Sequence, residues 1–315
     1  MLQNKKKTML TVNLVTYNHE KWIGECLDSI LAQKTNFNFI IRIFDDCSTD
    51  KTSEICSEYA KKYPEQIELH LSETNIGITE NCLRTYQNIK TPYYIYIEGD
   101  DYICNNKRFQ MQVDALEKHK DCSFCVGMTE ERTSNTQTLV GLTPILPKEG
   151  VVTLAYIKKH PEKHIFSYLL SRVVRTDCIK IDNDIKNRDF YLLDVTQIYE
   201  LLKQGNMYYI KKVFGVYRHT GNGIVSGLSR FDRIKFIFDY CYNYNQYTNG
   251  EFYQNLVLYL NRCLPYFCFY DKKINGFINF VQKIKRYFIP RFLLDILCIP
   301  RDICRIIKKK GRYYE

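Results

Sequence analysis

Three carboxylates lie within four residues at Glu98-Gly99-Asp100-Asp101, directly after the apolar run 93–97. Like charges at this spacing repel one another, and a buried carboxylate also loses its hydration. A divalent cation removes both costs. Hard oxygen ligands suit Mg²⁺ or Mn²⁺, which bridge protein carboxylates to substrate phosphates. We therefore expect a metal site for a phosphorylated ligand here, and a solvated acidic turn is the competing interpretation.

Two more polar clusters follow apolar runs of the same kind. They are Thr16-Tyr17-Asn18, at the end of 10–17, and Asp45-Asp46, directly after 39–44. In open parallel sheets, ligands bind at the carboxyl ends of the strands. If each run is such a strand, the three clusters border one crevice for a charged ligand.

The first part of the chain alternates between strand-like and helix-like segments. The expected strands are 10–17, 39–44, 66–72 and 93–97, and the expected helices are 19–31, 49–63, 79–89 and 105–118. Asn18 is expected to cap the first helix, and Thr49 or Asp50 the second, which Pro64 ends. Strands separated by helices of this length indicate βαβ units. The predicted fold class is α/β, with a mostly parallel, doubly wound sheet and flanking helices.

The remainder of the chain has weaker signals. We expect an irregular binding loop or connection at 129–165, a helix at 195–203, and a strand or strand pair at 208–217. Beyond Ser229 the chain is expected to be helical. The predicted domains are 1–225, which binds the ligand and carries catalysis, and 226–315, a helical and basic C-terminal extension.

An ordered set of motifs resembles the inverting glycosyltransferases of family 2, which have the GT-A fold. Over roughly 9–225 the motifs are Thr16-Tyr17-Asn18; Asp45-Asp46-Cys47-Ser48-Thr49-Asp50, close to the family's D-D-x-S-x-D; Asn75-Ile76-Gly77 before a helix; Glu98-Gly99-Asp100-Asp101 at the D-x-D-D position; Asp194; and Tyr217-Arg218-His219. The family's acidic motif usually opens with Asp, whereas this chain has Glu98. The longer side chain keeps the charge but moves it outward by a methylene group.

The resemblance implies a hexosyl- or N-acetylhexosaminyl-transferase that uses a nucleoside-diphosphate sugar, with a UDP-sugar as the expected donor. It implies donor contacts from residues near the strand ends, namely Thr16, Tyr17, Asn18, Asp45, Asp46, Arg84, Glu98, Gly99, Asp100, Arg218 and His219. It also implies Mn²⁺ or Mg²⁺ as the cofactor, held by Asp100 and Asp101.

The resemblance further implies a carboxylate general base, because an inverting transfer must take a proton from the acceptor hydroxyl. Asp194 is the expected base and Asp189 the second choice. The structural alternative for Asp194 is an N-cap at the start of its helix. His19 is expected to be a solvated residue of a first helical turn.

Other functions are less consistent with the sequence. A nicotinamide dehydrogenase would show G-x-G-x-x-G after the first strand, and 16–21 contains no glycine. A nucleotidyltransferase that makes activated sugars would need a Gly-rich, basic loop at the same place. A catalytically silent binding module of the same fold is the alternative function, favoured if Asp194 is only a helix cap. The pair Asp100-Asp101 favours the enzyme.

The cysteines bear on the compartment. The chain has 13, without a regular framework, and the close C-x-x-C pair is Cys122 and Cys125. We expect reduced, mostly buried thiols, which indicate the cytoplasm.

Charge is concentrated at the C-terminal end. The net charge is +10, and residues 272–315, with 12 Lys/Arg and 3 Asp/Glu, carry +9 of it. A nucleic-acid binder spreads its charge over the domain that contacts the ligand, so no nucleic-acid partner is expected. Basic residues mixed with apolar ones predict that 272–315 lies on an anionic membrane surface, and helices packed on the core are the alternative. The expected location is cytoplasmic and peripheral on the inner face of the plasma membrane. The expected acceptor is a glycan or a lipid-linked molecule in the assembly of a surface polysaccharide or glycolipid.

Overall fold

The computed structural model describes residues 6–159, 168–179, 194–221 and 243–251, together with the single positions 228, 232, 236 and 240. The chain divides into two compact units, Met1–Gly227 and Leu228–Glu315. The sheet and the candidate site belong to the first unit. Most of the predicted C-terminal extension, including all of 272–315, lies outside the described residues, and the assignment of roles to 1–225 and 226–315 stays a prediction.

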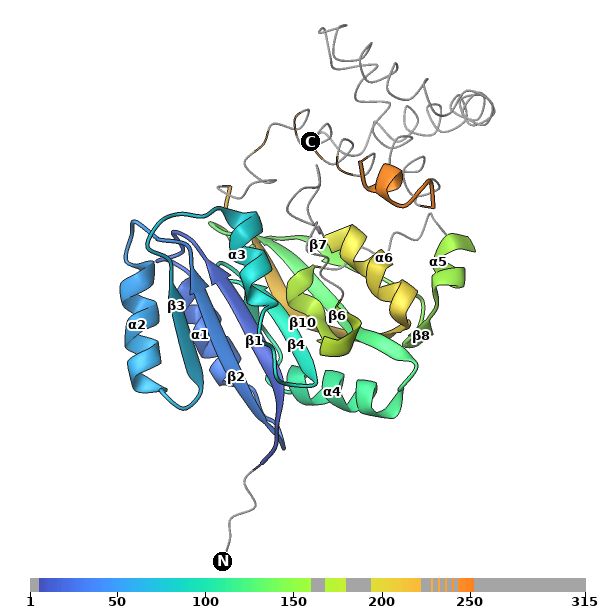
Figure 1. Cartoon of the computed structure of the whole chain (residues 1–315), viewed down its shortest axis with the longest axis horizontal. Helices are drawn as coiled ribbons and strands as arrows, with labels where there is room; N and C mark the ends of the chain where they lie inside the picture. The colour runs from blue at the N-terminus through green and yellow to red at the C-terminus, as the bar shows by residue number, and fades with distance from the viewer. Residues whose placement is uncertain are drawn as a thin grey trace, which may run out of the picture. The chain divides into compact units, whose positions relative to one another are not determined.

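The amino-terminal half of the sheet is parallel, as the sequence predicts. Its strands, in the spatial order β3-β2-β1-β4, are β1 (Thr8–Thr16), β2 (Asn38–Asp45), β3 (Ile67–Leu71) and β4 (Tyr93–Glu98). The register pairs Thr16 with Asp45, and Val15 with Glu98. The last residues of β1, β2 and β4 therefore lie at one edge of the sheet (Figure 1). The α/β class is confirmed.

The second half of the sheet is mixed and holds the strands that the sequence revealed least. These are β5 (Tyr102–Ile103), β6 (Cys122–Thr133), β7 (Leu139–Thr143), β8 (Gly150–Val152), β9 (Arg172–Arg175) and β10 (Asn206–His219). Strand β9 is antiparallel to both β4 and β6 and so joins the two halves. Strand β10 is parallel to β6, and the short β5 and β8 run antiparallel to β10.

The expectation that 129–165 is irregular is wrong. This stretch holds the end of β6, all of β7 and β8, and the helix α5 (Leu154–Lys159). Val152 of β8 pairs with Met207 of β10, a partner far along the chain. Local periodicity does not report such pairing, because the hydrogen bonds that define a short strand come from its neighbour. Pro144 and Pro147 lie in the connection between β7 and β8, whereas Gly141 lies within β7 and Gly150 begins β8.

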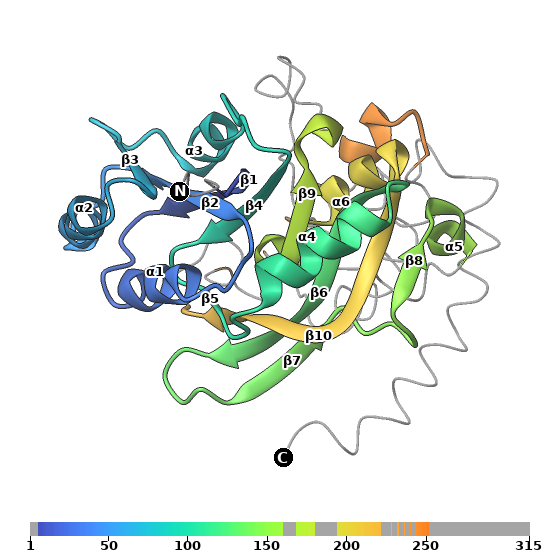
Figure 2. The ribbon, with the colours of Figure 1, turned by 90° about the horizontal axis from the view of Figure 1, so that it is seen from below.

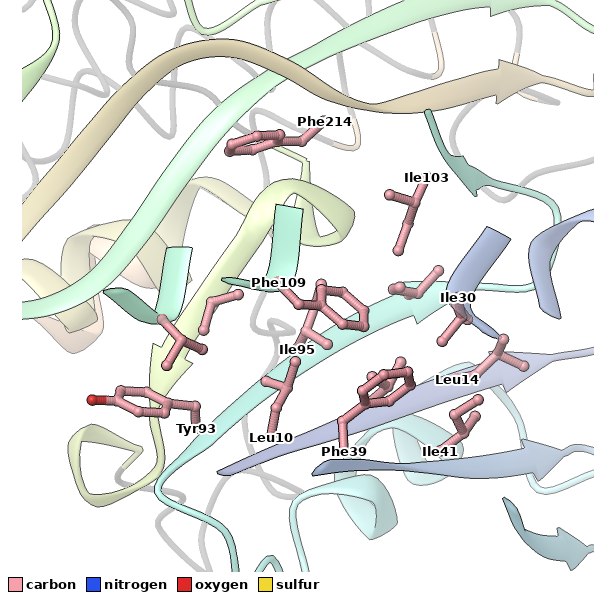
Figure 3. Packing of buried hydrophobic residues seen from close by; sticks show 14 of the residues in the cluster. Leu10, Leu14, Ile30, Phe39, Ile41, Tyr93, Ile95, Ile103, Phe109 and Phe214 are labelled. Carbon is pink, nitrogen blue, oxygen red and sulfur yellow. The ribbon is translucent and has the colours of Figure 1, made fainter. Parts of the chain in front are cut away.

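Helices cover both faces of the sheet. The longer ones among the described residues are α1 (Ile23–Leu31), α2 (Thr52–Lys62), α3 (Ile78–Thr85), α4 (Arg108–Lys118) and α6 (Asp194–Gln204). Helices α1 and α4 pack in the main core, where Ile30 lies near Leu14 of β1 (Figure 3) and the ring of Phe109 packs edge-on against Phe39 of β2. Helix α3 lies on the opposite face, where Cys82 packs against Phe44 and Tyr96 (Figure 2).

Neither of the two predicted helix caps occupies the N-cap position. Helix α1 begins at Ile23 with Trp22 before it, so the expectation that Asn18 caps this helix is wrong. Asn18 instead has a positive φ of 55° and its Oδ1 accepts a hydrogen bond from the backbone N–H of Thr49, which ties two loops together. Helix α2 begins at Thr52 with Lys51 before it, so the expectation that Thr49 or Asp50 caps it is wrong as well, although Oδ1 of Asp50 accepts a hydrogen bond from the backbone N–H of Thr52 at 2.9 Å.

Helix α3 ends at Thr85, four residues before the predicted end at Ile89. Within the described part of the chain, no helix is both long enough and apolar enough to cross a membrane.

Candidate active site

The three polar clusters meet at the carboxyl edge of the parallel strands. The backbone N–H of Gly99 donates to the carbonyl of Val15 at 2.9 Å, and the N–H of Asp46 donates to the carbonyl of Thr16 at 3.1 Å. These bonds continue the ladders of β1 with β4 and β2 beyond the strand ends. The loops that carry the acidic residues are therefore fixed against the end of β1.

The acidic loop, residues 98–101, gathers its three carboxylates. Oxygen atoms of Glu98, Asp100 and Asp101 lie within 4.8 Å of one another. Asp101 is only 1% exposed. Burial first, and then the negative charges of Asp100 and Glu98, raise the pKa of Asp101 well above its ordinary value.

This loop fits a hard divalent cation. Burial and the neighbouring negative charges make it costly to ionise Asp101, and a positive charge placed among the three carboxyl groups would offset that cost. The donor set is oxygen only, which matches the preference of Mg²⁺ and Mn²⁺. Glu98 belongs to the cluster together with the two expected ligands, Asp100 and Asp101.

Gly99 is fixed by close packing. A Cβ atom at this position would lie 2.7 Å from Oγ1 of Thr16, 2.9 Å from Nδ1 of His19 and 2.9 Å from Cδ1 of Ile23. Glycine thus lets the loop after β1 approach the acidic loop closely. The expected donor contact of Gly99 stays a prediction, and the packing supplies an independent reason for glycine.

His19 belongs to this site, and the expectation that it is a solvated helical residue is wrong. Its Nδ1 lies 3.2 Å from Oγ1 of Thr16, and its Nε2 lies 3.9 Å from Oδ2 of Asp100. Its backbone N–H donates to Oγ1 of Thr52. The signal in the sequence was its place in the loop after the first strand, next to residues already expected to contact the donor.

Asp45 and Asp46 are buried and have different partners. Asp45 accepts hydrogen bonds from the backbone N–H of Ser48 and from the hydroxyl of Ser53. Asp46 accepts from the backbone N–H groups of Ile76, at 2.8 Å, and Gly77, at 2.9 Å. Asp46 therefore links the motif after β2 to the motif that begins α3.

Arg84 braces the end of β2 from α3. Its Nη2 donates to the carbonyl of Asp45, its Nη1 to Oγ of Ser72, and its Nε to Oδ1 of Asn81. The guanidinium also lies over the ring of Phe44, with 5.3 Å between its central carbon and the ring centre. Through these contacts Arg84 fixes the backbone that presents the Asp45 carboxylate.

The residues after β1 give the site an exposed rim. Tyr17 is 42% exposed and directly precedes Asn18 at the start of the loop. An aromatic ring that is open to solvent is suited to contact a base or a sugar. The expected donor contacts of Thr16, Tyr17 and Asn18 stay predictions.

The end of β10 reaches the acidic loop from the other half of the sheet. The backbone N–H of Arg218 donates to Oδ1 of Asp101 at 3.0 Å, and its Nη1 donates to the carbonyl of Asp100 at 2.7 Å. The next residue, His219, has its Nε2 3.2 Å from Oε2 of Glu131 on β6. The sequence singled out Arg218 and His219, whereas nothing in it pointed to Glu131.

Asp194, the expected general base, is the first residue of α6. Its side chain lies outside the described part of the structure, as does Asp189. The catalytic role of either residue stays a prediction.

The chain belongs to glycosyl transferase family 2, because residues 11–169 match that family. It is 35% identical to an uncharacterized protein of Mycobacterium tuberculosis over 116 residues, which are 37% of this chain and 34% of that protein. It is 25% identical to the minor teichoic acid biosynthesis protein GgaB of Bacillus subtilis over 179 residues, 54% of this chain and 18% of that protein. The chain thus spans about a third or less of the length of these two relatives.

The fold is similar to that of a solved structure of S. aureus TarS. Residues 1–349 of S. aureus TarS, crystallised with UDP-GlcNAc, superpose with a TM-score of 0.63 at 18% identity, covering 98% of this chain and 93% of that chain. This likeness confirms the predicted architecture. The family match and this likeness together place the chain in glycosyl transferase family 2 with a GT-A fold.

Proposed function

We propose that the protein transfers a sugar from a nucleoside-diphosphate donor, a UDP-sugar, to a hydroxyl group of a glycan or lipid-linked acceptor. The transfer inverts the anomeric centre and depends on a divalent cation. The observation that carries the proposal is the gathering of Glu98, Asp100 and Asp101 at the end of β4, beside the ends of β1 and β2. The UDP-GlcNAc bound to TarS supports the choice of donor.

The donor occupies the edge where the three loops meet. Thr16, Tyr17 and Asn18 contact the nucleoside on one side, and Asp45 and Asp46 lie on the other. Arg84 supports this pocket through the backbone of Asp45. His219 follows Arg218 at the end of β10 and contacts a phosphate oxygen in this proposal.

Asp100 and Asp101 hold Mn²⁺ or Mg²⁺ in this proposal, with Glu98 beside them. When bound, the cation neutralises negative charge on the departing nucleoside diphosphate. The protein's own contribution is to align donor and acceptor, which removes much of the entropic cost of their encounter.

Asp194 acts as the general base. Its carboxylate takes the proton of the acceptor hydroxyl while that oxygen bonds to the anomeric carbon. The bond between that carbon and the phosphate oxygen breaks on the opposite side, and the electron pair leaves with the nucleoside diphosphate. One displacement of this kind inverts the configuration and needs no covalent intermediate with the enzyme.

The proposed setting is the assembly of a surface polysaccharide or glycolipid at the cytoplasmic face of the membrane. The name of GgaB supports a polymer of this kind. The described cysteines are free thiols, consistent with a reducing compartment. Residues 272–315 supply the contact with anionic lipid, since each Lys or Arg near such a surface contributes about 1 kcal/mol.

The membrane contact has its own test. The full chain co-sediments with anionic vesicles at low salt, whereas a chain ending near Asp271 stays in the supernatant. Equal sedimentation of both chains would contradict this part of the proposal.

Calorimetry with a panel of nucleoside diphosphates, with and without Mn²⁺, tests the donor site. We expect UDP to bind in a Mn²⁺-dependent manner and Asp100→Asn to abolish that dependence. The substitution keeps the shape of the side chain and removes the charge. Failure of every nucleotide to bind would favour the catalytically silent module of the same fold.

A further inference from the structure

Arg218 forms hydrogen bonds with two residues of the acidic loop. Its backbone N–H bonds to the carboxylate of Asp101 and its Nη1 to the carbonyl of Asp100. Its guanidinium carbon lies 4.3 Å from the centre of the Tyr102 ring. The side chain is 3% exposed, so it offers almost no surface to a ligand.

Glu25 completes this arrangement from helix α1. Nη2 of Arg218 donates to Oε2 of Glu25, which is 59% exposed. The pair joins α1 to the end of β10 across the acidic loop. Glu25 also compensates the positive charge of Arg218. Without it, the guanidinium beside the acidic loop would weaken the attraction of the loop's carboxylates for a cation.

We infer that Glu25 and Arg218 form a positioning pair for the acidic loop. The hydrogen bonds of Arg218 fix the Asp100 carbonyl and the Asp101 carboxylate, so that the three carboxylates of the acidic loop are held close together. Glu25 balances the positive charge of Arg218. Arg218 then acts by positioning the acidic loop. The family resemblance instead implies that Arg218 contacts the donor directly. The part of the inference that concerns the cation rests on the proposed function, and the part that concerns the loop's backbone does not.

Glu25→Gln is the informative variant, because Glu25 is exposed and the substitution keeps its shape. Glu68→Gln is its matched control. Glu68 is 56% exposed and lies 3.5 Å from Nε of Arg42, whose side chain is 8% exposed. Both substitutions therefore remove one exposed carboxylate from one nearly buried arginine, but Glu68 is on β3, away from the acidic loop.

Two measurements are made on the full-length protein. Hydrogen exchange follows the amides of Gly99 and Asp101, which bond to the carbonyls of Val15 and Glu98. Electron paramagnetic resonance follows the binding of Mn²⁺ alone, without nucleotide. We expect Glu25→Gln to speed exchange in the acidic loop and to lower Mn²⁺ affinity about tenfold, as loss of a group that orients metal ligands does. Glu68→Gln should change neither.

Arg218→Lys gives a second test, because lysine keeps the charge but loses the fork of donors. We expect it to act in the same direction as Glu25→Gln. Unchanged exchange and unchanged Mn²⁺ affinity in both variants, with UDP binding lost in Arg218→Lys, would overturn the inference and restore a phosphate contact. If the wild type binds no Mn²⁺ while Glu25→Gln still speeds exchange, the cation in the proposed function fails and the positioning pair stands.

Discussion

Asp46, at the end of β2, holds the backbone of Gly77 at the start of α3 with a hydrogen bond of 2.9 Å. The same carboxylate accepts the N–H of Ile76. One buried side chain thus joins two motifs that the sequence places thirty positions apart. The relation gives Asp46 a structural role in addition to any contact with a nucleoside.

Asp46→Ala should destabilise the protein by about 1.5–3 kcal/mol, because the part-buried amides of Ile76 and Gly77 lose a charged acceptor. Urea unfolding measures the change. Asp114→Ala is the control, since Asp114 is exposed and bonds to the side chain of Gln110 on the same helix. A loss equal to that of the control would show that Asp46 does not hold the loop.

Gly99→Ala should reduce both stability and Mn²⁺-dependent nucleotide binding. The added methyl group would lie 2.7 Å from Thr16 and must push the loop after β1 away, at a cost of about 1–3 kcal/mol. Gly24→Ala provides the opposite case, because a Cβ there meets only the Tyr59 hydroxyl at 3.9 Å, inside helix α1. That change should stabilise by about 0.5–1 kcal/mol. Thermal unfolding and calorimetry of both variants check the pair, and equal effects would refute the packing argument.

His19→Ala should weaken the binding of Mn²⁺ alone, by less than Asp100→Asn does. The imidazole fills the space between Thr16 and the Asp100 carboxylate, so its removal lets that carboxylate turn. Mn²⁺ titration followed by electron paramagnetic resonance gives the comparison. His119→Ala serves as control, because His119 stacks on Tyr208 at the end of α4. Wild-type affinity in His19→Ala would leave His19 with a packing role alone.

Two cysteines of the same region should differ in reactivity. The thiolate is the reactive form, and burial raises the pKa of Cys56 to about 12, so Cys56 should resist iodoacetamide at neutral pH. Cys47 is only partly buried, so the reagent can reach its thiol and it should react. It directly follows Asp46 in the chain. Mass spectrometry after brief labelling locates the modified residues. UDP with Mn²⁺ should slow labelling of Cys47 if the donor lies on this loop, and an unchanged rate would argue against that placement.

The sequence predicted the parallel half of the sheet well, for a local reason. Each apolar run there ends at a polar cluster, so strand, loop and helix follow one another along the chain. Thr16, Asp45 and Glu98 could be assigned to one edge because parallel strands share the direction of their ends.

Most strands of the mixed half could not be predicted, because their contacts join distant positions; β10, expected as a strand at 208–217, is the exception. Arg218 meets Asp100 across 118 positions, and Glu25 across 193. Neither partner carries a local signal of the other. His19 was missed for a related reason, since part of its environment is made by Gly99 and Asp100 of the acidic loop, which are distant in the sequence.

The acidic loop, residues 98–101, connects the last residue of β4, Glu98, to the first residue of β5, Tyr102. Both ends are fixed, because β4 pairs with β1 and β5 pairs with β10. A short connection whose two ends are both fixed by strand pairing cannot accommodate an inserted residue or the loss of one. The length of this connection is therefore constrained as strictly as its composition, and insertions or deletions accepted elsewhere on the surface should be excluded here even when every acidic residue is kept.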